Sequence, residues 1–176
     1  MTVKNEARRK GFFIRGIRSF FEHRALWMYF LCDEARKSGA NPGEFAPRAI
    51  RRCGSYHGMR ALTGLQDAAA HREQRTGGSC KLLKKRLFSP VGRAVFEMKI
   101  LQVSDDVFNV DFYYCPLVAA WKKQNCSGKE MDTMCDWAME GDRGIAESFG
   151  CELELPKTIA RGDGICQIRF KRKGRP

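Results

Sequence analysis

The sequence contains no long apolar run and no apolar leader. Its longest uninterrupted apolar stretch, Ala25 to Cys32, is far shorter than the roughly 20 residues that a membrane-spanning helix needs. Residues 1–16 carry basic side chains but lack the apolar core and cleavage site of a secretory signal. We therefore expect a cytoplasmic protein with no membrane partner.

The sequence also lacks any C-x-x-C pair, although it contains eight cysteines. Thiols stay reduced in a cytoplasm, so disulfides are the less favoured interpretation. The spacing argues against a zinc finger or ribbon, and we expect no metal ion or other cofactor. The cysteines are Cys32, Cys53, Cys80, Cys115, Cys126, Cys135, Cys151 and Cys166.

Acidic side chains are scarce in the first half of this 176-residue chain. Residues 1–93 hold 20 Lys and Arg against 7 Asp and Glu, a net charge of +13, whereas residues 94–176 hold 12 against 13, a net charge of −1. Clustered basic residues attract anions. No nucleic-acid-binding motif accompanies them, so nucleic acid is a poor candidate and a small anionic substrate is the expected partner. Assembly into a homo-oligomer stays open.

The first half has the spacing of helices. Apolar residues recur at helical intervals between Phe12 and Lys37, and a loop from Ser38 to Gly43 follows. A second helix is predicted from about Phe45 to Thr63, where Gly54 and Gly58 indicate close approach of another helix. We expect a short helix and a turn within residues 64–80, and another short helix from Cys80 to Phe88.

The second half combines strands and helices. Two alternating segments, 94–103 and 107–115, predict a β-hairpin, and helices are expected at 116–123 and 129–149, the latter kinked or split at Gly141 and Gly144. Segments 151–155 and 165–170 predict a second hairpin with a tight turn at 161–164. The result is one α+β domain, a helical N-terminal half packed on an antiparallel sheet of two hairpins with helices between them.

The expected boundaries are a flexible basic N-terminus at 1–10, the domain at 11–172 and a basic tail at 173–176. Within the domain, residues 11–90 are mainly helical, and residues 91–172 form the sheet plus two helices.

Cys115 is the first candidate for chemistry. It ends a predicted strand and precedes Pro116, a residue favoured at the first position of a helix, so it occupies a helix N-cap. The helix dipole and free N–H groups there can lower the pKa of a thiol and make it nucleophilic. A small buried residue is the simpler explanation.

Other candidates lie on the next helix and the last strand. Cys135, Met139 and Asp142 share one face of the predicted 129–149 helix, with Asp136 one step round it. Cys166 alternates with apolar residues toward the interior, and His57 lies on an apolar stripe where an imidazole could act as an acid or base. Core packing is the alternative for each of them.

Three segments form a recognisable set: Tyr114-Cys115-Pro116, then Met134-Cys135-Asp136-Trp137, and then the segment from Thr158 to Phe170. Taken together they resemble the L-2-amino-thiazoline-4-carboxylic acid hydrolase family. The resemblance covers residues 94–172 well and the first half more loosely, through the long helix and the segment Arg52 to Gly58. The sequence departs from the family pattern at Gln167, where an acidic residue is more usual.

The resemblance implies hydrolytic opening of a C=N bond in a small cyclic sulfur and nitrogen substrate, which yields a carbamoyl-cysteine. Cys115 would be the nucleophile, Asp136 or Asp142 would handle protons, and Cys135 would assist or replace Cys115. An arginine of the basic half would hold the substrate carboxylate. Two other classes stay open: a small-molecule-binding or sensor domain, and a protein whose Cys115, Cys135 and Cys166 hold a metal or cofactor.

Overall fold

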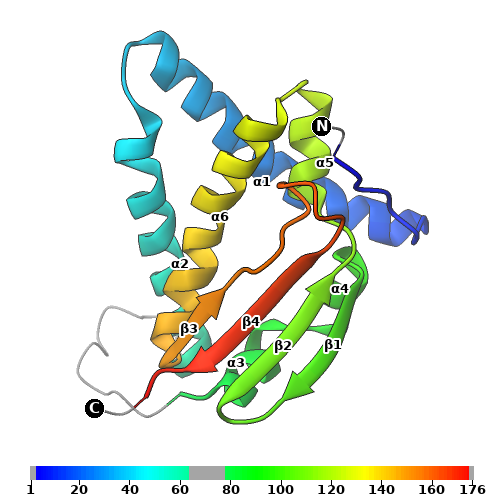
Figure 1. Cartoon of the computed structure of the whole chain (residues 1–176), viewed down its shortest axis with the longest axis vertical. Coiled ribbons are helices and arrows are strands. Elements are labelled where there is room, and N and C mark those ends of the chain that lie inside the picture. Colours follow the sequence, from blue (N-terminus) through cyan, green and yellow to red (C-terminus); the bar gives the residue numbers. More distant parts are fainter. Residues whose placement is uncertain (1–2, 64–77, 175–176) are drawn as a thin grey trace.

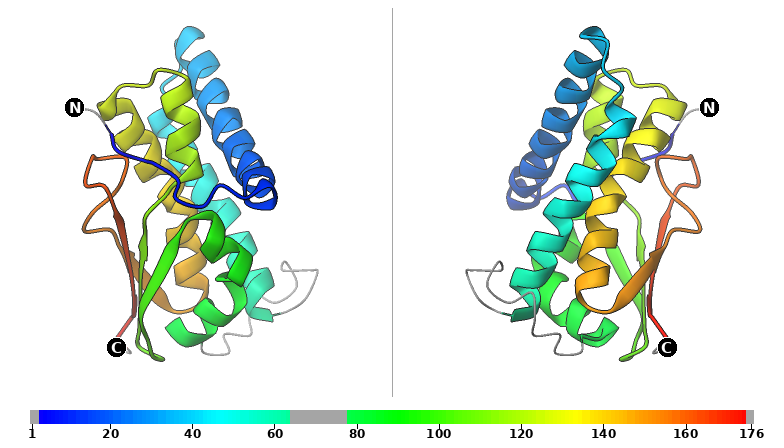
Figure 2. Two further views of the ribbon diagram at one scale, coloured as in Figure 1. Left: turned by 90° about the vertical axis from the view of Figure 1, so that its right-hand side faces the viewer. Right: turned by 90° about the vertical axis from the view of Figure 1, so that its left-hand side faces the viewer.

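The computed structural model describes residues 3–63 and 78–174, which form a helical layer on one side of a four-stranded sheet (Figures 1 and 2). The elements, in chain order, are α1 (Phe12–Lys37), the 3-10 helix η1 (Pro42–Glu44), α2 (Ala46–Thr63), α3 (Cys80–Leu87), α4 (Pro90–Val95), β1 (Met98–Val103), β2 (Val107–Phe112), α5 (Pro116–Lys123), α6 (Gly128–Ser148), β3 (Cys151–Glu154) and β4 (Cys166–Arg172).

The sheet is antiparallel throughout, with strand order β1-β2-β4-β3. Its central register pairs Phe108 with Phe170 and Phe112 with Cys166. Alternate residues of β4 are buried, from Cys166 to Phe170, and the rings of Phe108 and Phe170 stack 5.6 Å apart in the core. The predicted α+β class is confirmed, and the buried face of the central strands points at the helices.

Glycines allow α2 and α6 to pack closely where the two helices cross. A Cβ atom at Gly54 would overlap the carbonyl oxygen of Gly141, and one at Gly58 would lie 2.5 Å from Ser148 Oγ. Gly144 of α6 is likewise in close contact with the backbone of α2. The predicted close helix approach is confirmed. The split expected at Gly141 and Gly144 is wrong, because α6 is one continuous helix and these glycines lie at the contact with α2.

Two local predictions in the second half need correction. The first strand does not begin at residue 94, because Ser89 caps α4 by accepting a bond from Gly92 N and Pro90 starts that helix. The chain turns at Glu97, whose φ is 52°, and β1 starts at Met98.

The second hairpin has no tight turn at 161–164. Residues 155–165 form a long connection between β3 and β4, in which Ile159 and Ala160 are completely buried in the core. The strands still pair, from Cys151 with Arg172 to Glu154 with Arg169.

The N-terminal segment packs against the domain over residues 3–10. Val3 is 3% exposed, and its carbonyl oxygen accepts a 2.8 Å bond from Lys122 Nζ. Asn5 makes two bonds with the backbone of Cys115: its Nδ2 donates to the carbonyl oxygen at 2.8 Å, and its Oδ1 accepts from the N–H at 2.9 Å. This segment therefore holds the residue before α5 in place.

Some expectations fall on residues 64–77 and 175–176, which lie outside the described part of the chain. They include most of the short helix and turn expected at 64–80. The helix predicted from Cys80 is present as α3. Among the described helices, none has the length and apolar character needed to cross a membrane.

Candidate functional site

A cavity of about 260 Å³ lies between the helical layer and the inner face of the sheet. We call it the inner cavity. Three thiols and one carboxyl group are the chemically active groups in a wall that is otherwise mainly apolar and aromatic. Its lining is Phe21, Arg24, Leu83, Leu87, Phe88, Gly92, Phe96, Met98, Phe112, Cys115, Leu117, Trp121, Cys135, Ala138, Met139, Asp142, Ile145, Cys166, Ile168 and Phe170.

Cys115 occupies the N-cap of α5, as the sequence predicts. Its side chain makes no capping hydrogen bond. Burial is the largest influence and raises the pKa of the Cys115 thiol, while the N–H groups of Val118 and Leu117 oppose this rise only in part. The expectation of a lowered pKa is therefore wrong, because desolvation of the thiolate outweighs the helix start. Burial thus favours the protonated form of the Cys115 thiol.

Cys135 and Cys166 face the same cavity from α6 and β4. Burial raises the pKa of Cys135 well above its usual value, and negative charge on Cys115 or Cys166 would raise it further. Burial also raises the pKa of Cys166 to about 12. The Cys166 sulfur accepts a 3.2 Å bond from the N–H of Ile159, so the long β3–β4 connection fixes its position. Three thiols far apart in sequence thus share one cavity.

The two candidate aspartates of α6 have different surroundings. Asp142 lines the inner cavity with Cys135 and Met139, as their shared helix face predicts. Asp136 is 65% exposed and forms a 2.8 Å ion pair with Arg143 Nη2 on the outside. Burial raises the pKa of Asp142, although Arg24 and Arg143 lower it in part. Asp142 is therefore suited to hold a proton inside the cavity, and Asp136 lies away from it.

A second hollow of about 290 Å³, the outer cavity, lies beside the first between α1, α2 and α6. Arg24, Leu117, Ala138, Asp142 and Ile145 line both cavities. His57 lines the outer cavity and is exposed, so it does not reach the inner thiols. The stripe that contains His57 faces this hollow, because the glycine face of α2 is the one packed on α6.

Arg24 is a residue that the sequence did not single out. It is the one Lys or Arg among the described residues that line either cavity, and its guanidinium lies over the Phe21 ring at 5.9 Å. Helical spacing could not distinguish it from Arg18, which is buried and pairs with Glu97. Cys53, at the outer cavity, was also missed because it is isolated in sequence from the other candidates.

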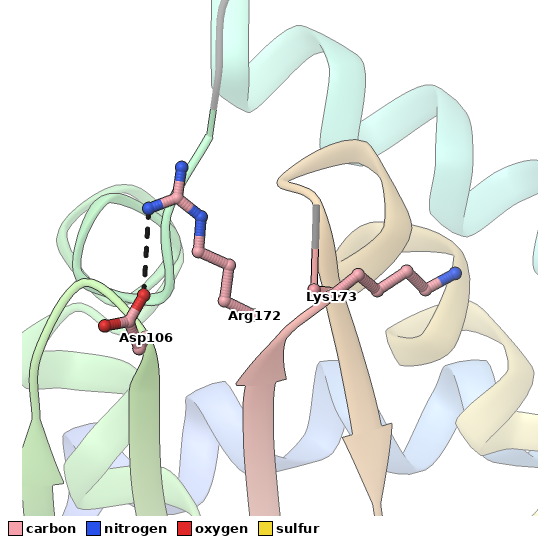
Figure 3. A pocket seen from close by; sticks show the side chains of 4 residues that line it. Asp106, Arg172 and Lys173 are labelled. Atoms are coloured by element: carbon pink, nitrogen blue, oxygen red, sulfur yellow. Dashed lines mark ion pairs between the residues drawn. The ribbon is translucent and has the colours of Figure 1, made fainter. Parts of the chain in front are cut away.

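A third hollow, at the end of β4, has a different character (Figure 3). It measures about 490 Å³ and is lined by Asp106, Arg172, Lys173 and Gly174. Figure 3 shows Arg172 turned toward Asp106, to which it is paired at 3.7 Å, while Lys173 points away. Its lining offers no thiol and no apolar floor, so the cysteine-lined cavity is the better candidate site.

The grouped thiols do not form a metal-binding constellation. Across residues 3–63 and 78–174, no three His, Cys, Asp or Glu side chains are placed so that they could hold one ion together. The inner cavity therefore has the features of a small-molecule site: a mainly apolar space with one carboxyl group, one guanidinium cation and three thiols.

Three thiols, a buried carboxyl group and a guanidinium group thus line the inner cavity. The sequence model of the L-2-amino-thiazoline-4-carboxylic acid hydrolase family matches residues 18–170, and the chain belongs to this family. The family name supports a hydrolase role in general terms. A comparison with curated proteins finds no match.

Among solved structures, the fold is similar to a trafficking protein particle complex subunit 3 from Naegleria fowleri, in a crystal structure covalently bound to palmitic acid. The two chains are 15% identical with a TM-score of 0.51, over 89% of this chain and 97% of that chain. At this identity the likeness shows a shared fold.

Proposed function

We propose that this protein is a hydrolase that opens the C=N bond of a small cyclic sulfur and nitrogen substrate, of the type of 2-amino-thiazoline-4-carboxylate, to a carbamoyl-cysteine. Family membership supports the reaction class. The observation that carries the assignment of residues is the meeting of Cys115, Asp142 and Arg24 at one cavity. Each has a role that such a reaction needs.

The first half of the proposed reaction breaks the ring. Asp142 gives its proton to the ring nitrogen, and the Cys115 sulfur adds to the carbon of the C=N bond while the thiol proton passes to the Asp142 carboxylate. The bond between that carbon and the ring nitrogen then breaks, and the nitrogen leaves as an amine with the proton that Asp142 returns. The carbon stays attached to Cys115.

The second half restores the protein. Water adds to the same carbon and gives a proton to the Asp142 carboxylate, and the bond to Cys115 then breaks. The Cys115 thiolate recovers the proton that the new carbonyl group releases, and the product is the substrate plus one water. Arg24 would bind the substrate carboxylate, as the basic side chain that borders both cavities.

A second candidate is a binding protein that holds an apolar ligand without turning it over. The observation that favours it is the wall of the inner cavity, where six aromatic side chains outnumber the two charged ones. The aromatic residues are Phe21, Phe88, Phe96, Phe112, Trp121 and Phe170. The structural neighbour holds palmitic acid covalently, so an acyl chain is the ligand we would try first on this alternative.

The test is product analysis by mass spectrometry after incubation with 2-amino-thiazoline-4-carboxylate. We expect a product heavier by one water, lost in Cys115→Ser and in Asp142→Asn. Matched controls are Cys126→Ser and Asp136→Asn, a thiol and a carboxylate outside both cavities, which should keep full activity. Full activity of both Cys115→Ser and Cys135→Ser would refute cysteine catalysis. Stoichiometric palmitate binding by folded protein without any turnover would favour the second candidate.

A further inference from the structure

One face of α1 is apolar and is not covered by any other described part of the chain. Two faces of this helix differ sharply: Arg18, Ala25 and Cys32 are buried toward the domain, whereas six large apolar residues on the other side face solvent. Their exposed fractions are Phe12 87%, Phe13 67%, Phe20 75%, Trp27 61%, Phe30 50% and Leu31 63%. We call these six residues the α1 stripe. Both views of Figure 2 place α1 on the outside of the helical layer, away from the sheet.

The spacing of the α1 stripe is that of a helix-pairing seam. Phe13, Phe20 and Trp27 follow one another at seven-residue intervals, which brings them to nearly the same side of a helix. At about 100° per residue, Leu31 lies within roughly 20° of Phe20 around the axis. The stripe is therefore straight and continuous over most of the helix, as in helices that pack lengthwise against another helix.

The area of the α1 stripe exceeds what a monomer ordinarily exposes. With about 200 Å² for each large side chain and two-thirds of it exposed, six residues present roughly 800 Å². The largest apolar patch of a monomer is usually about 300–600 Å². About 800 Å² on each partner is the area buried in a stable protein–protein interface of standard size. The stripe is thus large enough to sustain a dimer.

The charges around the stripe favour a second protein surface over a lipid surface. Helices that lie in membranes carry a basic polar face beside the apolar one. Here the exposed positions along the stripe include Arg24, four residues after Phe20, and Glu34, seven residues after Trp27. Glu34 pairs with Lys37 at 2.7 Å, and Arg18 is buried in an ion pair with Glu97. The border of the stripe therefore carries charges of both signs and is not the uniformly basic border that suits anionic lipids.

We propose that the α1 stripe packs against the same stripe of a second copy in a homodimer. A twofold interface buries the same patch on both partners, which a straight apolar stripe satisfies with itself. Phe20 and Trp27 lie at the centre of the interface, where large aromatic residues contribute most to affinity. The proposal does not depend on the proposed reaction.

The test is sedimentation velocity of the full chain over a wide concentration range. We expect a species of about twice the 20.1 kDa of the chain, and a monomer for Phe20→Glu combined with Trp27→Glu. Both positions are exposed, so the circular dichroism spectrum should not change. The matched control is Leu101→Glu on β1, where an apolar side chain is 48% exposed, and it should remain dimeric.

Three results would overturn the proposal. A wild-type monomer at every concentration would do so, and so would a dimer that survives the double substitution. A wild-type monomer that cosediments with vesicles containing anionic phospholipid would assign the stripe to a membrane instead. If the double variant does not fold, Phe20→Ser alone should weaken association by at least tenfold, and an unchanged dissociation constant would contradict the proposal.

Discussion

Replacement of Gly54 by alanine should destabilise the protein, although alanine is the better helix former. In the middle of a helix the exchange is worth about 1 kcal/mol of stabilisation by propensity alone. At Gly54, however, the new Cβ would lie 2.6 Å from the carbonyl carbon of Gly141 and would overlap its oxygen. Backbone atoms cannot rotate away as a side-chain tip can, so α2 and α6 must separate.

Separation of the helices costs more than the propensity gains. Overpacking of a tight contact typically costs about 1–3 kcal/mol and can cost more. The same separation loosens the contacts of Gly58 with Ser148 and of Gly144 with Ser55. We expect a net loss of about 2 kcal/mol, which in a domain of this size lowers Tm by about 4–8 °C.

Thermal unfolding followed by circular dichroism measures this effect, with Gly141→Ala as the matched control. That glycine lies at the same crossing, but its Cβ would meet only Ile50, with Cγ2 at 3.4 Å and the carbonyl oxygen at 3.8 Å, which are ordinary contacts. The control should gain about 1 kcal/mol and raise Tm by about 2–4 °C. The reasoning is refuted if Gly54→Ala unfolds at or above the wild-type temperature, or if the two variants behave alike.

Three further predictions concern buried polar groups. Asp142→Asn should stabilise the protein at pH 7. Burial raises the pKa of Asp142 in the folded protein, so the stability of the wild type is greatest below the pKa that Asp142 has in the unfolded chain and falls as pH rises above it. The difference in Tm between the variant and the wild type should therefore vanish in acid. Arg18→Met should cost about 3–5 kcal/mol, measured by urea unfolding, because it leaves Glu97 buried without its 2.9 Å partner. Alkylation by iodoacetamide, mapped by mass spectrometry, should modify exposed Cys53 well before Cys115 and Cys166 at neutral pH, because burial raises the pKa of both inner thiols; equal rates in folded protein would contradict this.

Local signals in the sequence predict most of the elements. Periodicity locates α1, α2 and α6 within one or two residues, and the cysteine before Pro116 correctly marks the start of α5. The glycines of α2 predict a close helix approach, because their cost in a helix needs a reason. Strand-like alternation after residue 94 obscures α4, whose sequence signal is the capping pair Ser89-Pro90.

Features that depend on long-range packing could not be predicted from the sequence. The connection between β3 and β4 has turn residues, but the burial of Ile159 and Ala160 depends on space left in the core. The sequence leaves Asp136 and Asp142 as alternatives, since they are neighbours on one helix. Only the position of α1 and α5 beside α6 shows that Asp142 faces the cavity. The predicted direction of the Cys115 pKa shift was wrong for the same reason, because the extent of desolvation depends on the whole cavity wall.

The two raised pKa values at the candidate site impose an order on the proposed reaction. Burial raises the pKa of both the Cys115 thiol and the Asp142 carboxyl group, so it favours the protonated form of each. A resting thiol is a weak nucleophile, whereas a buried protonated carboxyl group is a ready proton donor. Proton transfer from Asp142 to the ring nitrogen should therefore come first, and the cationic ring would then lower the pKa of the adjacent thiol.

This order has a consequence for the dependence of the rate on pH. If Asp142 must be protonated at the start, kcat/KM should fall as pH rises through the raised pKa of its carboxyl group. A resting thiolate would give the opposite slope, because its population increases with pH. A rate that rises steadily to alkaline pH would therefore show that Cys115 ionises before the substrate is protonated, and would assign the controlling titration to the thiol instead of the carboxyl group.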